Sequence, residues 1–60
     1  LEGQEREVFD AVAAAGAAGI DIDHVVDSTG LDASRVLATI AVLEMRRLLR
    51  RLPGSRVQRA

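Results

Sequence analysis

Arginine residues in the second half of the chain are the side chains best suited to bind a ligand. Residues 33–60 contain seven arginines and a single acid, Glu44. A guanidinium group is planar and permanently charged, and it can give a phosphate two hydrogen bonds at once. The sequence therefore predicts weak, mainly electrostatic contacts to nucleic-acid phosphates from six of these residues: Arg35, Arg46, Arg47, Arg50, Arg51 and Arg56.

The two halves of the chain carry opposite charge. Residues 1–32 contain eight acids and one arginine, which gives a formal charge of −7, whereas the charge of residues 33–60 is +6. The net charge of −1 on the whole chain would argue against a nucleic-acid partner. The concentration of positive charge in residues 33–60 nevertheless makes nucleic-acid binding an interpretation to consider. A second interpretation stays open, in which the arginines form a solvated surface and pair with Glu44 or with the acidic half.

Side chains for catalysis or metal binding are scarce in this chain of 60 residues. It contains one histidine and no cysteine, tyrosine, tryptophan or lysine. His24 lies close to Asp23 and Asp27 in the sequence, but a mixed ligand set without cysteine or a second histidine makes a poor zinc site. We therefore expect no enzymatic activity, no metal and no cofactor, and we interpret His24 as a surface residue among acids.

Three helices are predicted to position the arginines. Apolar residues recur at helical spacing over residues 4–15, 22–29 and 33–46. The first of these helices would direct Val8 and Val12 inward. The third would direct four apolar residues toward the core: Val36, Leu37, Ile40 and Leu43.

Aspartate and glycine residues mark the ends of these helices. Asp21 and Asp32 are expected N-caps, because a short carboxylate can accept a backbone N–H of the first helical turn. For Asp21 the expected donor is the N–H of His24. Gly16 and Gly30 are expected to end the first two helices in a left-handed conformation, which costs glycine little.

An arginine-rich β-hairpin is predicted after the third helix. Residues 48–52 and 56–59 are the expected strands, joined by a turn at Pro53-Gly54. The glycine-containing turn over residues 29–32 is typical of a helix-turn-helix. Together these elements predict a mainly α fold with a small β-hairpin, a winged helix-turn-helix of three helices plus a wing. The alternative architecture is a plain three-helix bundle with a frayed tail.

The outward side of the predicted third helix is poorly suited to reading bases. This helix contains neither asparagine nor glutamine, so any DNA binding is expected to be non-specific. Its apolar residues could instead form a partner surface, and the acidic helices of one copy could dock on the basic side of another. The residues expected to face outward are Ser34, Arg35, Ala38, Thr39, Val42 and Met45.

Two segments of the chain resemble the C-terminal winged-helix domain of the DprA (Smf) family. Residues 19–31, GIDIDHVVDSTGL, resemble the pattern "sIdeLaerTGL", and residues 48–56, LLRRLPGSR, resemble the wing pattern "Glv.rlpGgry". The resemblance extends over nearly the whole chain. This chain departs from the family at Arg47, where glycine is usual, and at Val57, where an aromatic residue is common. A left-handed backbone at Arg47 would cost roughly 1 kcal/mol relative to glycine.

The resemblance implies an accessory module of a DNA-processing protein that acts in natural transformation. The parent protein would protect single-stranded DNA and help to load RecA through a central domain, and RecA or another protein would be a partner through the parent. Because the chain begins at Leu1 and not at methionine, it is expected to be a piece of a longer protein, and the resemblance implies that residues 1–60 are a single winged-helix domain at the C-terminus of that protein. Without a signal peptide or an apolar membrane-spanning run, it is expected to be cytoplasmic, with no membrane partner. The alternative is a protein-interaction or self-association module with no DNA binding of its own.

Overall fold

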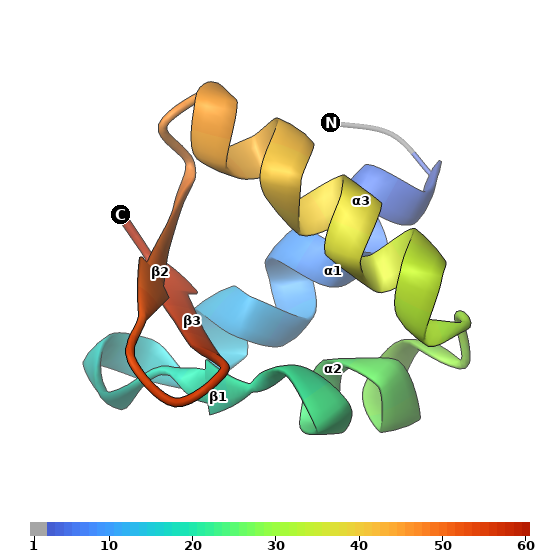
Figure 1. Cartoon of the computed structure of the whole chain (residues 1–60), viewed down its shortest axis with the longest axis horizontal. Helices are drawn as coiled ribbons and strands as arrows, with labels where there is room; N and C mark the ends of the chain where they lie inside the picture. Colours follow the sequence, from blue (N-terminus) through green and yellow to red (C-terminus); the bar gives the residue numbers. More distant parts are fainter. Residues whose placement is uncertain (1–2) are drawn as a thin grey trace.

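The computed structural model describes residues 3–60, in which three α-helices pack beside a small β-sheet (Figure 1). This arrangement confirms the winged helix-turn-helix and shows that the plain three-helix bundle is wrong, because the tail forms a wing. No helix among the described residues has the length and apolar character needed to cross a membrane. In chain order the elements are α1 (Gly3–Ala14), a 3-10 turn η1 (Gly16–Ala18), β1 (Ile20–Asp21), α2 (Ile22–Thr29), α3 (Ala33–Met45), β2 (Leu49–Leu52) and β3 (Arg56–Arg59).

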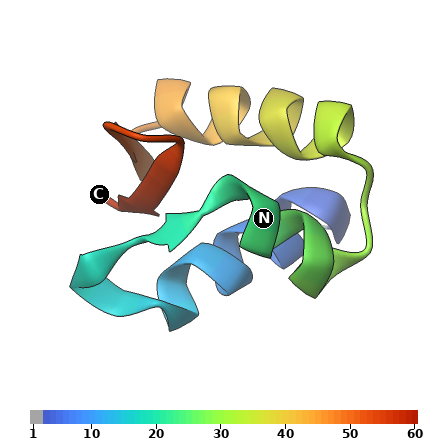
Figure 2. The same cartoon turned by 60° about the horizontal axis from the view of Figure 1, so that its bottom comes forward.

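The last strand of the chain lies in the centre of the sheet. The strand order is β1-β3-β2, and β3 is antiparallel to both neighbours. Val57 is opposite Ile20 on one side and Arg51 on the other. Figure 2 shows the sheet at one end of the molecule, with α3 on one side and α1 and α2 on the other. The wing is therefore joined directly to the segment that begins the helix-turn-helix.

The hydrophobic core lies between the three helices and the inner side of the sheet. The predicted core positions Val8 and Val12 of α1 are fully buried, as are Ile40 and Leu43 of α3. On the sheet side, Val57 of β3 covers the core and is also fully buried. Because each α-helix and both wing strands contribute at least one apolar side chain to this single cluster, α3 and the wing hold fixed positions relative to each other.

Two positions on α3 differ from the prediction. Leu37 was expected in the core but is 40% exposed, whereas Thr39 was expected to face outward but is only 4% exposed. At 100° per residue, Val36, Ile40 and Leu43 span an arc of about 60° on α3. Thr39 lies about 40° beyond the Leu43 edge of this arc, whereas Leu37 lies about 60° beyond the Ile40 edge. The Thr39 hydroxyl is satisfied inside, because it donates to the carbonyl of Arg35 at 2.7 Å.

The predicted helix caps are present, with one correction. Asp32 accepts the backbone N–H of Arg35 at 2.9 Å. Asp21 is also an N-cap, but it accepts the N–H of Asp23 at 3.0 Å and not that of His24. Asp21 is the last residue of β1 as well, so strand pairing constrains its backbone and its short carboxylate reaches only the nearer N–H. Gly16 and Gly30 have the expected positive φ angles of 72° and 74°.

A Schellman motif ends α3 and places Arg47 in the left-handed region. The N–H of Leu48 donates to the carbonyl of Leu43, and the N–H of Arg47 donates to that of Glu44, both at 2.9 Å. This pattern requires a left-handed residue at Arg47, where φ is 61°. The helix therefore ends at Met45, one residue earlier than predicted, and β2 begins one residue later, at Leu49, because the N–H of Leu48 serves the motif.

The turn of the wing has two features that were not predicted. Three residues join β2 to β3, and Ser55 has a positive φ of 61° in addition to the expected Gly54 at 77°. The carbonyl of Ser55 accepts the N–H of Ile22 at 3.0 Å, which ties the tip of the wing to the start of α2.

Candidate nucleic-acid interface

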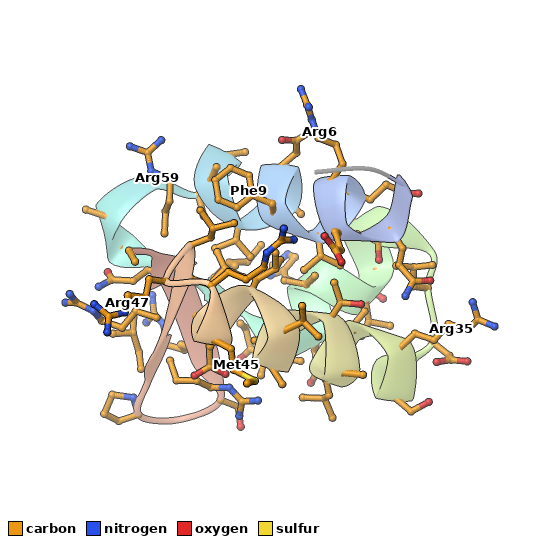
Figure 3. All side chains as sticks on the ribbon, turned by 90° about the horizontal axis from the view of Figure 1, so that it is seen from above. Arg6, Phe9, Arg35, Met45, Arg47 and Arg59 are labelled. Carbon is orange, nitrogen blue, oxygen red and sulfur yellow. The ribbon has the colours of Figure 1, made fainter. Side chains whose placement is uncertain are left out.

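The six predicted arginines are divided between the two ends of α3. Arg35 lies in the first turn of α3 and Arg47 lies just beyond its last turn, so Figure 3 shows them at opposite sides of the molecule. Arg46 is next to Arg47, and the remaining three arginines lie on the two wing strands. The fold therefore brings five of the predicted residues to the wing end of the molecule and leaves Arg35 apart.

The register of the wing strands sends neighbouring arginines to opposite faces of the sheet. Arg51 lies opposite the buried Val57, so its side chain leaves from the face that is turned toward α3. Arg50 lies opposite Gln58 and shares the outer face with Arg56. The outer face of the wing therefore presents Arg50 and Arg56.

Two of the predicted arginines form ion pairs across the fold. Arg46 donates to the carboxylate of Glu5 on α1 at 2.9 Å, and Arg51 lies 3.2 Å from the carboxylate of Glu44 on α3. All four side chains are partly exposed to solvent. Ion pairs of this kind contribute roughly 0–1 kcal/mol each, so a phosphate could displace either carboxylate at modest cost. The expected pairing with Glu44 and with the acidic half is thus confirmed for these two residues.

Arg35 and Arg56 are also held by contacts within the chain. Arg35 donates to the side-chain oxygen of Gln4 at 3.3 Å and lies 4.0 Å from the carboxylate of Asp32. Arg56 donates to the backbone carbonyl of Ala18 in the 3-10 turn. Both guanidinium groups remain exposed, and each has further N–H donors beyond the one used in these contacts.

Arg47 and Arg50 differ from the other four predicted residues. Within residues 3–60, neither side chain forms an ion pair or a hydrogen bond. Both are exposed, and they line a shallow hollow together with Glu44, Leu49 and Arg51. Arg59, which was left out of the six predicted residues, is exposed on β3 opposite Leu49 and has no such partner in the described part of the chain. This end of the molecule therefore offers guanidinium groups that an anion can reach without displacing a carboxylate.

The capping aspartate at the start of α3 has a shifted pKa. The backbone N–H of Arg35 lowers the pKa of Asp32 below its ordinary value, and the hydroxyl of Ser34 lowers it further. Both donors favour the charged carboxylate. His24, in contrast, is exposed, and no three histidine, aspartate or glutamate side chains of residues 3–60 are close enough to share a metal ion.

The outward surface of α3 is more apolar than the sequence suggested. Because Thr39 is buried, only Ser34 and Arg35 remain as polar residues that could contact a base from this helix. Val42 is 43% exposed and Met45 is 85% exposed. Such a surface carries few hydrogen-bonding groups for the edges of base pairs.

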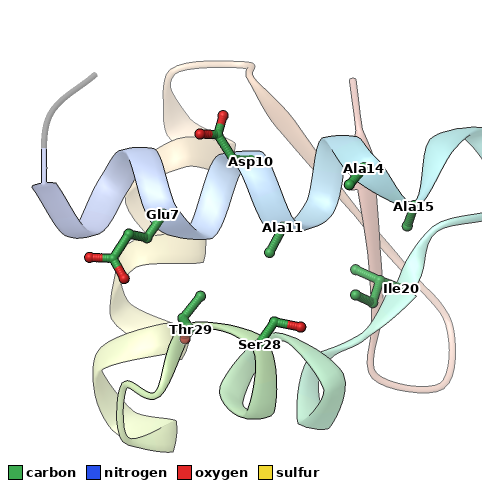
Figure 4. A pocket seen from close by; sticks show the side chains of 8 residues that line it. All are labelled: Glu7, Asp10, Ala11, Ala14, Ala15, Ile20, Ser28 and Thr29. Atoms are coloured by element: carbon green, nitrogen blue, oxygen red, sulfur yellow. The ribbon is translucent and has the colours of Figure 1, made fainter.

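A groove between α1 and α2 was not found by sequence reasoning. Figure 4 shows its lining, in which Glu7 and Asp10 stand on α1 and Ser28 and Thr29 on α2. Alanines of α1 and Ile20 complete it. The sequence signal was weak, because alanines within a helix indicate neither a core nor a site on their own.

Comparison with known protein families gives a match over most of the chain. A family model described as the DprA winged helix domain matches residues 1–55 of the chain. No curated protein and no solved structure matches the chain significantly. The matched stretch covers all three helices and β2, and it ends in the wing turn just before β3.

Proposed function

This chain belongs to the DprA winged-helix domain family, and on that premise we propose that it is an accessory module of a DprA-like DNA-processing protein. In this proposal the parent protein acts in natural transformation, where it protects single-stranded DNA and helps to load RecA. The module itself contacts DNA weakly and without sequence preference. The contacts run from the arginines at the end of α3 and on the wing to DNA phosphates.

The observation that carries this proposal is the pair of unpartnered arginines beside the wing. Arg47 and Arg50 are exposed and form no ion pair within the described residues. Phosphate contacts of this type position a protein on DNA but carry no sequence information. The apolar outer surface of α3 supports the same conclusion, because it offers little for base recognition.

The acids at this end of the molecule support a low affinity. Glu5 and Glu44 occupy the guanidinium groups of Arg46 and Arg51, so DNA phosphates must compete with carboxylates for them. The acidic half of the chain also repels the DNA backbone. We therefore expect binding to fall steeply as salt is added, because few contacts other than phosphate contacts support it.

A titration of labelled duplex and single-stranded DNA, followed by fluorescence anisotropy, tests this proposal. We expect salt-sensitive binding between about 20 and 200 mM salt and a slope of log K against log salt that Arg50→Ala reduces by about 1. The matched control is Arg6→Ala, which removes the same charge from α1. Arg6 pairs with Asp10 at 3.3 Å and lies on the other side of the molecule from Met45 (Figure 3).

Three results would contradict phosphate contact at the wing. They are no binding to either form of DNA at the lowest salt, a binding constant that does not change with salt, and equal effects of Arg50→Ala and Arg6→Ala. The last result would mean that only the total charge of the chain matters.

A protein-interaction or self-association module is the second candidate function. The exposed apolar side chains of α3 favour it, since Val42 and Met45 lie on the outer surface of the helix. In this case the chain would not bind DNA on its own, and Arg50→Ala would leave its behaviour toward DNA unchanged.

A further inference from the structure

The outer face of α3 is an apolar surface that the other described residues, 3–60, leave exposed. We define this face by Leu37, Ala38, Ala41, Val42 and Met45, all of which are exposed. Met45 protrudes furthest, with 85% of its surface accessible. Methionine is flexible and unbranched, so it adapts to an irregular apolar hollow better than other side chains do.

The groove between α1 and α2 has a shape and chemistry that suit such a side chain. Its volume is about 650 Å³, and its lining includes Ala11, Ala14, Ala15 and Ile20. Because alanine side chains are short, they leave the space above α1 unfilled. An inserted methionine would therefore exchange water for apolar contacts.

The outer face of α3 and the groove lie on opposite sides of the same molecule. Figure 2 shows α3 on one side of the fold and α1 and α2 on the other, and Figure 4 views the groove with α3 behind it. One chain therefore cannot bring its own Met45 into its own groove. A contact between these two surfaces must join two copies.

The charges beside the two surfaces are complementary. Arg47 follows Met45 closely, and within residues 3–60 its guanidinium has no partner. Glu7 and Asp10 stand at the α1 edge of the groove, and Glu7 likewise has no ion-pair partner among the described residues. The charges of −7 and +6 on the two halves of the chain extend this match to the whole molecule. Complementary charges of this kind steer association and select an orientation.

We propose that the α1–α2 groove of one copy binds the outer face of α3 of a second copy, with Met45 inserted and Arg47 facing the acidic edge. The contact joins two different surfaces, so each copy that is added presents a free groove or a free face to the next copy. Such head-to-tail contacts form open chains of molecules unless a rotation closes them into a ring. This inference rests on the second candidate function above and is independent of DNA contact.

Sedimentation velocity of the chain alone, without DNA, tests the inference. We expect an average mass that keeps rising with concentration from about 20 μM to about 2 mM at low salt, with no plateau at two copies. Added salt should reduce the rise, because the charge contacts are exposed. Met45→Glu and Ala14→Glu should each weaken association at least tenfold, since either carboxylate would be buried in the contact. Ala33→Glu, which places the same charge at the exposed start of α3, is the matched control.

Mixing the two variants gives the sharper test. Met45→Glu retains an intact groove and Ala14→Glu retains an intact α3 face, so an equimolar mixture should form one-to-one pairs that grow no further. Both altered positions are exposed, and unchanged circular dichroism would show that the fold is retained. A wild-type chain that stays monomeric at every concentration would overturn the inference and leave the groove to another protein. A wild-type plateau at two copies, or a mixture that forms no pairs, would overturn it as well. A loss of DNA binding in the earlier titration would not affect this result.

Discussion

At the scale of single residues, the partner of each arginine decides whether it is available to DNA. Arg50 and Arg51 are adjacent in the sequence, yet Arg51 reaches Glu44 while Arg50 has no partner among the described residues. The cause is strand alternation, because consecutive side chains leave a strand on opposite faces. The arginines of this cluster therefore differ in how freely each can contact a phosphate, and the number of arginines alone does not reveal this difference.

Asp32 provides a residue-scale prediction about pH. Hydrogen bonds from the N–H of Arg35 and the hydroxyl of Ser34 lower its pKa in the folded chain. A carboxyl whose pKa is lower when folded stabilises the fold above its unfolded pKa, and that contribution is lost as pH falls through its folded pKa. We expect the melting temperature of the wild type to exceed that of Asp32→Asn near neutral pH, with the difference shrinking below about pH 4. Thermal melts of both proteins across this range, followed by circular dichroism, measure the difference.

The comparison with Asp32→Asn isolates one carboxyl, since the other acids titrate equally in both proteins. A difference in melting temperature that stayed constant from neutral pH to about pH 2 would show that Asp32 stabilises the helix without a change of protonation.

At the scale of elements, the short segment between α1 and α2 requires glycine at position 19, because the wing packs closely against it. Gly19 has a φ angle of 79° and lies against the wing. A Cβ atom at this position would lie 2.9 Å from Cδ1 of Leu52 and 3.0 Å from the carbonyl oxygen of Val57. Only glycine fits, because the position requires both a positive φ and the absence of a side chain.

Two glycine substitutions separate these requirements. Gly16→Ala should destabilise the fold by about 1 kcal/mol, because φ is 72° there but a Cβ atom would meet nothing within 4 Å. Gly19→Ala should cost about 2–4 kcal/mol, since steric overlap adds to the backbone strain. Urea unfolding of both variants measures the free energies. Equal losses of stability would mean that the wing moves aside easily and that the close approach at Gly19 is unimportant.

At the scale of the whole molecule, strand β3 completes both the sheet and the hydrophobic core. β3 lies between β1 and β2, and Val57 fills the core from the sheet side. The family match ends at residue 55, before this strand begins. Residues beyond the match are therefore required to complete the sheet.

Removal of residues 56–60 should abolish cooperative folding. The shortened chain would leave β1 and β2 without a partner and would open the core at Val57, in a domain whose total stability is roughly 3–9 kcal/mol by its size. Thermal melts followed by circular dichroism measure the transition, and a chain that ends at Arg59 is the control. A shortened chain that melts as cooperatively as the control would show that the three helices fold without the sheet.

The sequence alone determined the elements and the family. Several of the predictive features act over only a few residues, so each could be recognised from its immediate neighbours in the sequence. They are the helical spacing of apolar residues, the cap at Asp32, the glycine at position 30 and the turn at Pro53-Gly54. The resemblance to the DprA winged helix also rests on residue order and agrees with the family match. These features predicted three helices and a wing, and they placed most of the core.

Only the tertiary structure decided which side chains are free. Glu5 reaches Arg46 across 41 positions of sequence, and Gln4 reaches Thr39 across 35. Contacts at such separations depend on how the helices pack, and no local pattern encodes them. For the same reason the burial of Thr39, the exposure of Leu37 and the groove between α1 and α2 emerged only when the elements were brought together.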